Sequence, residues 1–192
     1  AQKGAARYDL IVIGSGPAGR RAAVQAAKLK KRVLVIERGR RVGGVSVHTG
    51  TIPSKTLRET VLNLSGWRER GFYGRAYRAK RDITAEDLRK RLHITLHHEV
   101  EVLEHQFARN LVDTIRGAAQ FVDPHTVLVE GPGGQALYTA ERFVIAVGTR
   151  PYRPGHIGFD GANIVDSDEI LDLTRIPRQL VVLCHGLGAD AH

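Results

Sequence analysis

Three glycines near the N-terminus stand at the spacing of a phosphate-binding turn. Gly14, Gly16 and Gly19 follow an apolar run and precede an alanine-rich stretch, an order typical of a turn that leads from a strand into a helix. Glycine lets the backbone approach a pyrophosphate, and the helix start offers free amides and a favourable dipole. Glu37 ends the next apolar run, where a carboxylate accepts hydrogen bonds from ribose hydroxyls and would repel a 2′-phosphate. We therefore predict a dinucleotide site.

A β-α-β unit of about thirty residues would position these groups. The apolar run Tyr8–Ile13 is typical of a parallel strand that is buried on both faces. A helix is predicted over Pro17–Leu29, and its alanines would let it lie close to the sheet. Arg32–Ile36 is predicted as the second strand. A glycine pattern alone is a weak signal, but a strand, glycines, helix, strand and acid in this order are specific.

Two further helices are predicted beyond this unit. Ser54 is a candidate N-cap for a helix that runs towards Leu64. A capping sequence at Thr84–Asp87 indicates the start of a longer helix, and a polar loop is predicted between the two over residues 68–81. Apolar residues at three- and four-residue spacing would form one stripe along the longer helix. The stripe comprises Leu88, Leu92, Leu96, Val100, Leu103, Phe107 and Leu111.

Strands are predicted again after the longer helix. Between Asp113 and Tyr138, short strand-like runs alternate with turn residues, which predicts a small antiparallel meander. Arg142–Val147 is predicted as a further buried strand, and Gln179–Cys184 as another. The predicted fold class is therefore α/β, a Rossmann-like domain with a parallel sheet plus a small antiparallel β-meander.

Composition and charge restrict the class of protein. The chain has 192 residues, of which 42% are hydrophobic and 26% charged, as in ordinary globular proteins. The formal net charge is +9, but the basic residues are scattered without interleaved aromatics, so no nucleic-acid partner is expected. No apolar run could span a bilayer, and the first residues lack the apolar core of a secretory signal. A single cysteine, Cys184, excludes an internal disulfide and favours a cytoplasmic setting.

One helix face carries residues at a spacing that could suit a metal. His93, His97, Glu101 and His105 follow one another at four-residue intervals, which could bring ligands together on one side of a helix. They flank the apolar stripe, however, and their surroundings are charged. We therefore favour a solvated helix face and predict no metal site. Cys184 is interpreted as a small buried hydrophobic residue.

The segment Gly43–Lys55 reads G-G-V-S-V-H-T-G-T-I-P-S-K. It resembles the signature of the pyridine nucleotide–disulfide oxidoreductase family, G-G-x-C-x-x-x-x-C-I-P-S-K, with Ser46 and Thr51 in the two cysteine positions. The thiol relay of that family is therefore absent. With residues 121–123, 147–152 and 166–168, the pattern is most similar to the soluble pyridine nucleotide transhydrogenases. The resemblance covers about residues 7–182 and implies a Rossmann-like FAD-binding domain.

The resemblance also implies two candidate catalytic residues. Lys55 matches a lysine that approaches N5 and O4 of the flavin, where a cation stabilises negative charge on the reduced ring. Thr51 falls where the chain meets the isoalloxazine. Two plainer interpretations stay open, Lys55 as a solvated helix residue and Thr51 as a packing residue. His48 is equally compatible with a place near the flavin and with a partly exposed loop.

The remaining cofactor-binding residues are assigned by the same resemblance to parts of FAD. They are Gly14, Ser15, Gly16, Pro17, Ala18 and Gly19 for the pyrophosphate; Ile36, Glu37 and Arg38 for the adenosine ribose; Gly43, Gly44, Val45 and Ser46 for the ribityl and phosphate part; Gly50 beside the ring, with Thr51 and Lys55; Gly117 and Ala118 for the adenine; and Ala146, Gly148 and Thr149 for the turn over the cofactor.

The resemblance implies a division of the chain and a function. Residues 1–177 are predicted as the FAD-binding domain and 178–192 as the truncated start of an NAD(P)-binding domain. The implied parent is a Si-specific NAD(P)+ transhydrogenase, which exchanges hydride between NADPH and NAD through flavin and forms a homo-oligomer through an interface domain. This chain alone is expected to be inactive. The alternatives are a non-catalytic FAD-binding fragment and a cysteine-free NAD(P)H:quinone or diaphorase-type flavoprotein.

Overall fold

The computed structural model of the chain describes residues 6–67, 74 and 82–183. The loop predicted over residues 68–81 therefore lies almost wholly outside the described residues, as does Cys184. The elements in chain order are β1 (Ala6–Ile13), α1 (Pro17–Lys28), β2 (Val33–Glu37), α2 (Gly44–His48), α3 (Thr51–Ser65), α5 (Ala85–Arg109), β3 (Asp113–Arg116), β4 (Ala118–Asp123), β5 (Thr126–Gly131), β6 (Gly134–Ile145) and a 3₁₀ turn at Glu169–Asp172.

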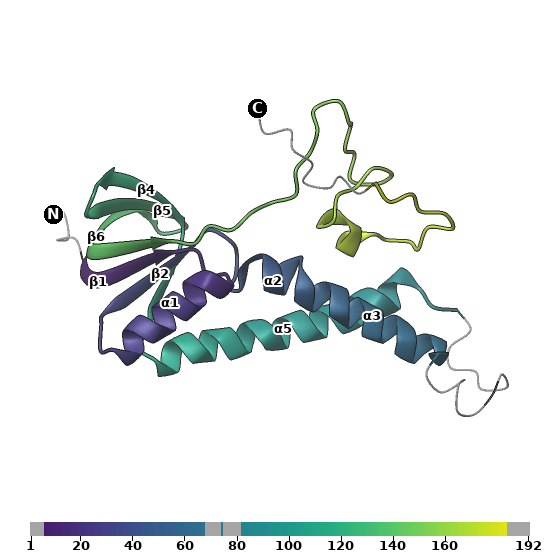
Figure 1. Cartoon of the computed structure of the whole chain (residues 1–192), viewed down its shortest axis with the longest axis horizontal. Coiled ribbons are helices and arrows are strands. Elements are labelled where there is room, and N and C mark those ends of the chain that lie inside the picture. The colour runs from purple at the N-terminus through teal and green to yellow at the C-terminus, as the bar shows by residue number, and fades with distance from the viewer. Residues whose placement is uncertain (1–5, 68–73, 75–81, 184–192) are drawn as a thin grey trace.

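The strands form one six-stranded sheet in the order β3-β2-β1-β6-β5-β4 (Figure 1). Strand β1 pairs in parallel with β2 and with β6, and β2 pairs in parallel with β3. Strand β5 is antiparallel to both β4 and β6. The parallel half and the antiparallel meander are thus both present, as predicted. They share β6, a single strand of 12 residues that begins before the predicted Arg142.

The start of the meander was placed wrongly by the sequence pattern. Asp113–Arg116 is β3, and it pairs in parallel with β2 instead of joining the antiparallel strands. Alternation of side chains shows that a segment is extended, but it does not show which strand will be its neighbour. The meander therefore begins at Ala118, after the bend at Gly117.

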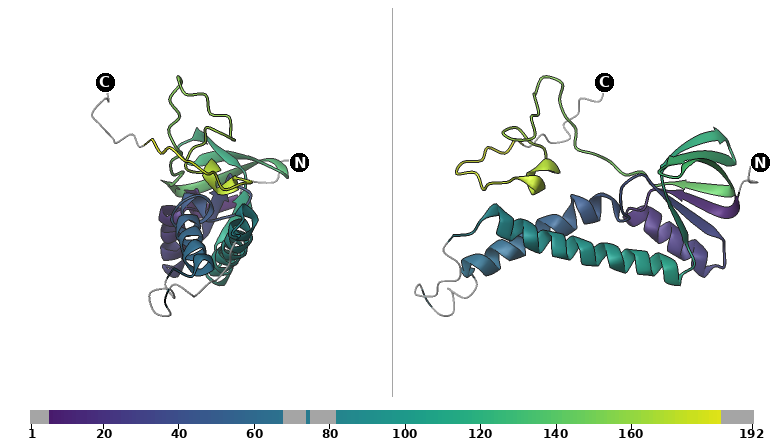
Figure 2. Two further views of the ribbon diagram at one scale, coloured as in Figure 1. Left: turned by 90° about the vertical axis from the view of Figure 1, so that its right-hand side faces the viewer. Right: turned by 180° about the vertical axis from the view of Figure 1, so that it is seen from behind.

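Two apolar cores lie on the two faces of the parallel strands. The helices cover one face (Figures 1 and 2), and this core joins Val12, Val33 and Val35 of the sheet to Ala23 of α1 and Phe107 of α5. On the other face, further side chains of β1 and β2 pack against β5 and β6 of the antiparallel half, a group that comprises Tyr8, Ile11, Leu34, Ile36, Val127, Val129 and Ala140. The burial of β1 on both faces confirms the interpretation of its apolar sequence.

The long helix α5 begins at the predicted cap. The Thr84 hydroxyl accepts a hydrogen bond from the Asp87 amide at 3.2 Å, and the Asp87 carboxylate accepts one from the Thr84 amide at 2.9 Å. Four residues of the predicted stripe are buried, namely Leu92, Val100, Leu103 and Phe107. Leu111 is not part of it, because the helix ends at Arg109 and Leu111 is 87% exposed in the following turn, at a positive φ of 56°.

This cap yields a stability prediction. Thr84→Ala should lower the free energy of unfolding by about 1 kcal/mol, since the Asp87 amide at the start of α5 loses its acceptor and the Asp87 carboxylate loses the hydroxyl as a donor. Thr95→Ala is the matched control, because the Thr95 hydroxyl only donates to the Arg91 carbonyl within the helix and alanine is the better helix former. Urea denaturation followed by circular dichroism would measure both. Equal losses in the two variants would contradict the prediction.

Helix α3 packs beside α5 and starts earlier than predicted (Figures 1 and 2). Its first residue is Thr51 and its N-cap is Gly50, so Ser54 is not the cap. Pro53 is tolerated in the first turn of this helix because its missing amide would have no helical partner there. The Ser54 hydroxyl donates to the Thr51 carbonyl instead, at 3.1 Å. Gly66 ends the helix in the left-handed conformation.

After β6 the chain leaves the sheet (Figure 1). Arg153 fixes a turn in this segment, with ion pairs of 2.7 Å to Asp166 and 2.8 Å to Glu169. The strand predicted from Gln179 is wrong over the described residues, which end at Leu183: they have no strand neighbour, and the Leu183 side chain is 83% exposed. Extended backbone needs such a neighbour to satisfy its amides and carbonyls. Among the described helices, none is long and apolar enough to cross a membrane.

Candidate functional site

The predicted phosphate turn lies between β1 and α1, and two of its glycines are packed too closely to carry a side chain. Gly14 has a φ of +104°, and a Cβ there would lie 2.2 Å from the Ala146 carbonyl oxygen at the end of β6. A Cβ on Gly19 would lie 2.0 Å from the Gly14 oxygen. Pro17 opens α1 after Gly16, and the structure shows no side-chain cap on this helix start. The first amides of α1 are therefore available to an anion.

The second glycine segment lies directly against this turn. A Cβ on Gly44 would lie 2.7 Å from the Gly16 Cα, so the two backbones are in contact. Gly43, at a φ of +125°, is the N-cap of the short helix α2, an element that the sequence pattern did not predict. Arg41 holds the preceding loop to α5 through two contacts with the Glu104 carboxylate, at 3.1 and 3.3 Å. Both predicted glycine segments thus meet at one place.

Glu37 is half-buried at the end of β2, as predicted, and it is held by three hydrogen bonds. One carboxylate oxygen accepts from the Ser15 amide at 2.9 Å and from the Ser15 hydroxyl, and the other accepts from the Gly39 amide at 2.7 Å. Burial by itself would raise the pKa of Glu37, but these hydrogen bonds, helped by the nearby His48, lower it below the usual value. The carboxylate is therefore charged near neutral pH.

The sequence analysis placed Ser15 in the pyrophosphate turn, but it did not predict what the Ser15 side chain contacts. It is 1% exposed. Besides donating to Glu37, its hydroxyl oxygen accepts a hydrogen bond from the Gly43 amide at 3.0 Å. The signal was present in the sequence, since a hydroxyl residue between two motif glycines can bond to neighbouring loops, but its partners are set only by the fold.

The other predicted adenosine contacts lie at the same edge of the sheet. The Gly14 amide donates to the Ile36 carbonyl at 2.8 Å, and the Gly117 amide donates to the Glu37 carbonyl at 2.9 Å. Arg38 follows Glu37 with an exposed side chain, and Ala118 begins β4, also exposed. The carboxyl end of a parallel sheet is where ligands of such folds bind.

The turn after β6 is only partly joined to this edge. The Ala146 amide donates to the Ile13 carbonyl at 2.8 Å, which places Ala146 beside the glycine turn. Gly148 has a φ of +70° with open space beside its Cα, and Thr149 is exposed. The described contacts do not bring Gly148 or Thr149 to the two glycine segments.

The two candidate catalytic residues lie on the first turns of α3, and both are exposed. Thr51 and Lys55 are four positions apart in one helix, so their side chains share a face. The Gly50 amide donates to the Val45 carbonyl at 2.6 Å, which joins this helix start to α2. The Ser46 hydroxyl donates to the Gly43 carbonyl at 3.3 Å. The roles of these residues toward a flavin stay predictions.

His48 is half-buried at the end of α2, and its Nε2 lies 3.0 Å from the Val42 carbonyl oxygen. The His48 ring is therefore held against the backbone at the start of the second glycine segment. A place near the flavin stays a prediction.

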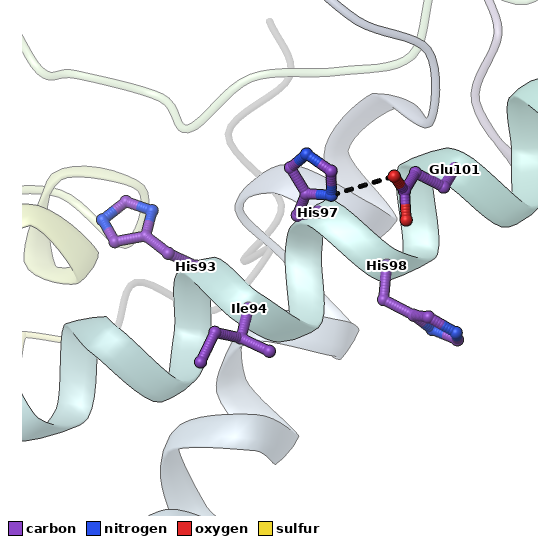
Figure 3. Close-up of a pocket in the computed structure, with 5 residues that line it drawn as sticks. All are labelled: His93, Ile94, His97, His98 and Glu101. Atoms are coloured by element: carbon purple, nitrogen blue, oxygen red, sulfur yellow. Dashed lines mark ion pairs between the residues drawn. The ribbon is translucent and has the colours of Figure 1, made fainter.

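The histidine face of α5 forms a shallow pocket lined by His93, Ile94, His97, His98 and Glu101 (Figure 3). His97 Nδ1 lies 3.4 Å from a Glu101 carboxylate oxygen. His97 and His98 point to opposite sides of the helix (Figure 3). Over the ranges that the structure describes, no three histidine, cysteine or acidic residues are grouped so that they could hold a metal ion.

The chain belongs to the pyridine nucleotide-disulphide oxidoreductase family, and the match covers residues 8–187. Family membership implies FAD as the cofactor and a Rossmann-like FAD-binding fold. The two glycine segments and Glu37 are the residues to which the family resemblance assigned contacts with FAD.

Among curated proteins, the chain is 50% identical to a soluble pyridine nucleotide transhydrogenase of Mycobacterium tuberculosis, over 94% of this chain and 39% of the relative. It is 37% identical to one from Colwellia psychrerythraea, over 94% and 38%. Among solved structures, it is similar to the HOCl-induced flavoprotein disulfide reductase RclA from Escherichia coli in its Cu(II) complex. The TM-score is 0.73 at 25% identity, over 89% of this chain and 35% of that one. The chain thus spans about two fifths of the length of the curated relatives.

Proposed function

We propose that this chain is the FAD-binding part of an enzyme that exchanges hydride between NADPH and NAD through the flavin. The observation that carries the proposal is the contact between the two glycine segments beside Glu37, at the carboxyl end of the parallel strands. The similarity to transhydrogenases at up to 50% identity supports this choice of reaction. NADPH and NAD are proposed as substrates of the whole protein, and a homo-oligomer as its assembly.

The residues at this edge fit FAD. Gly14 and Gly19 have no room for a Cβ, and the start of α1 offers amides without a side-chain cap, as a pyrophosphate requires. Glu37 is charged and its carboxylate keeps acceptor capacity for a ribose hydroxyl. FAD supplies a group that accepts and returns a hydride. This chain then binds and orients that group, and Lys55 stabilises negative charge at the ring by electrostatic attraction.

The residues in the two family cysteine positions favour hydride exchange over disulfide reduction. Ser46 and Thr51 are hydroxyl residues, so neither can form the disulfide that a dithiol relay needs. Hydride exchange between nucleotides needs no such relay, whereas disulfide reduction does. We further propose residues 1–177 as the FAD-binding domain, residues 178–192 as the start of an NAD(P)-binding domain, and the cytoplasm as the location.

A second candidate is FAD binding without turnover by this chain alone. It is favoured by the described residues, in which a glycine turn of this kind opens a helix directly after β1. A cysteine-free quinone or diaphorase-type reductase is the remaining alternative. The three functions differ in what reduces the bound flavin and in what reoxidises it.

The absorption spectrum of the purified chain tests these proposals. After incubation with FAD and gel filtration, the chain should carry flavin absorbance in the protein peak. Addition of NADPH should bleach it only slowly if the chain binds FAD without turnover. Rapid bleaching followed by reoxidation with NAD would show that the chain carries out the exchange itself, and reoxidation by a quinone alone would favour the reductase. Protein that stays colourless with FAD would overturn the cofactor proposal.

A further inference from the structure

We infer that Ser15 is a positioning residue for the adenosine ribose of the cofactor. Its hydroxyl fixes the carboxylate of Glu37 and joins it to the second glycine segment through Gly43. The inference rests on the proposed FAD site and adds to it a residue that determines how strongly the ribose hydroxyls are recognised.

The hydroxyl of Ser15 has one proton and two lone pairs, and its described partners use both kinds of group. The proton is donated to Glu37, because an ionised carboxylate can only accept. The oxygen then accepts from the Gly43 amide at 3.0 Å. The side chain is 1% exposed, so water does not compete for these bonds. Ser15 thus connects β1, β2 and the start of α2 through one buried atom.

This arrangement leaves Glu37 partly free to bind a ligand. A carboxylate has about four lone-pair positions, and the structure fills three of them, with the Ser15 amide, the Ser15 hydroxyl and the Gly39 amide. The bonds to both oxygens prevent rotation of the carboxylate, so its remaining acceptor position has a fixed direction. A ligand with vicinal ribose hydroxyls gains most from an acceptor that is held in place before binding.

Loss of the hydroxyl should therefore affect one part of the ligand more than the rest. In Ser15→Ala the amide of residue 15 remains, but the carboxylate loses its buried donor and Gly43 loses its acceptor. The contribution of the ribose hydroxyls to binding should fall. If the Ser15 hydroxyl only connected the two loops, its loss would weaken the binding of every part of the ligand equally.

The test compares FAD with an analogue whose adenosine ribose lacks both hydroxyls. Dissociation constants for both would be measured by flavin fluorescence on the full chain, on Ser15→Ala and on Ser65→Ala. Ser65 is the matched control, because its hydroxyl donates only to the Leu62 carbonyl at the end of α3. The unaltered chain and the control should prefer FAD by about tenfold, which is about 1.4 kcal/mol. Ser15→Ala should reduce that preference to about twofold.

Every other outcome overturns either the role of Ser15, the ribose contact of Glu37 or the proposed function. Equal weakening of both ligands by Ser15→Ala, with the tenfold preference kept, would overturn the positioning role. No preference in the unaltered chain would show that Glu37 does not bind the ribose, and this would overturn the inference while FAD binding stands. Failure of the unaltered chain to bind FAD would overturn the proposed function as well.

A second variant covers the case in which Ser15→Ala does not fold. Ser15→Cys nearly keeps the volume but is a weak hydrogen-bond donor, so its preference for FAD should also fall towards twofold. If neither variant folds, the role of Ser15 is structural and the inference is wrong.

Discussion

Gly16→Ala should keep its fold and lose most of its affinity for FAD. Gly16 has a φ of −62°, which alanine adopts readily, and a Cβ there would meet only the Gly44 Cα, at 4.0 Å. The protein itself therefore has room for the methyl group. A pyrophosphate bound at the start of α1 would not, because the second glycine of such a turn is where the backbone approaches the phosphates. We expect the dissociation constant to rise about tenfold or more.

The melting temperature separates this effect from damage to the fold. In the absence of FAD it should match that of the unaltered chain to within about 2 °C, as for a change with no named structural cost. Gly155→Ala is the matched control, since no atom lies within 4 Å of its Cβ position and it stands far from the glycine turn in sequence. The control should bind FAD normally. Unchanged FAD affinity in Gly16→Ala would contradict the proposed position of the pyrophosphate.

The sequence was enough to predict those elements whose structure depends on interactions within a few residues. The capping box at Thr84 and the apolar run of β1 each carry their own cause within a few residues, and both are confirmed. The glycines of the first turn were also predicted, and the structure adds the reason for two of them. Gly14 and Gly19 are needed because backbone atoms of other residues occupy the space of a Cβ.

Contacts between distant segments decided the features that the sequence did not show. Asp113 looked like the start of the meander, but β3 is parallel to β2, and only the folded sheet determines this pairing. The Ser15 hydroxyl bonds to residues 22 and 28 positions away. Ser54 was predicted as a cap because hydroxyl residues are common caps, whereas Gly50 is the cap here without a side-chain bond.

The closeness of β1 and β6 leads to the largest expected effect on stability, in Gly14→Ala. The new Cβ would lie 2.2 Å from the Ala146 oxygen and 3.3 Å from the Val147 amide nitrogen, and these backbone atoms cannot rotate away as a side chain would. The φ of +104° adds strain for any residue with a Cβ. Together we expect a loss of about 2–4 kcal/mol in the free energy of unfolding.

For a chain of this size that loss would lower the melting temperature by about 5–15 °C. Gly133→Ala is the control, in the hairpin between β5 and β6, where no atom lies within 4 Å of the Cβ position. Its melting temperature should change little. Thermal denaturation without FAD would measure both, so that the result concerns the protein alone. If Gly14→Ala had the same melting temperature as Gly133→Ala, the ends of β1 and β6 would be further apart than the structure shows. Ala146 would then not lie beside the proposed pyrophosphate.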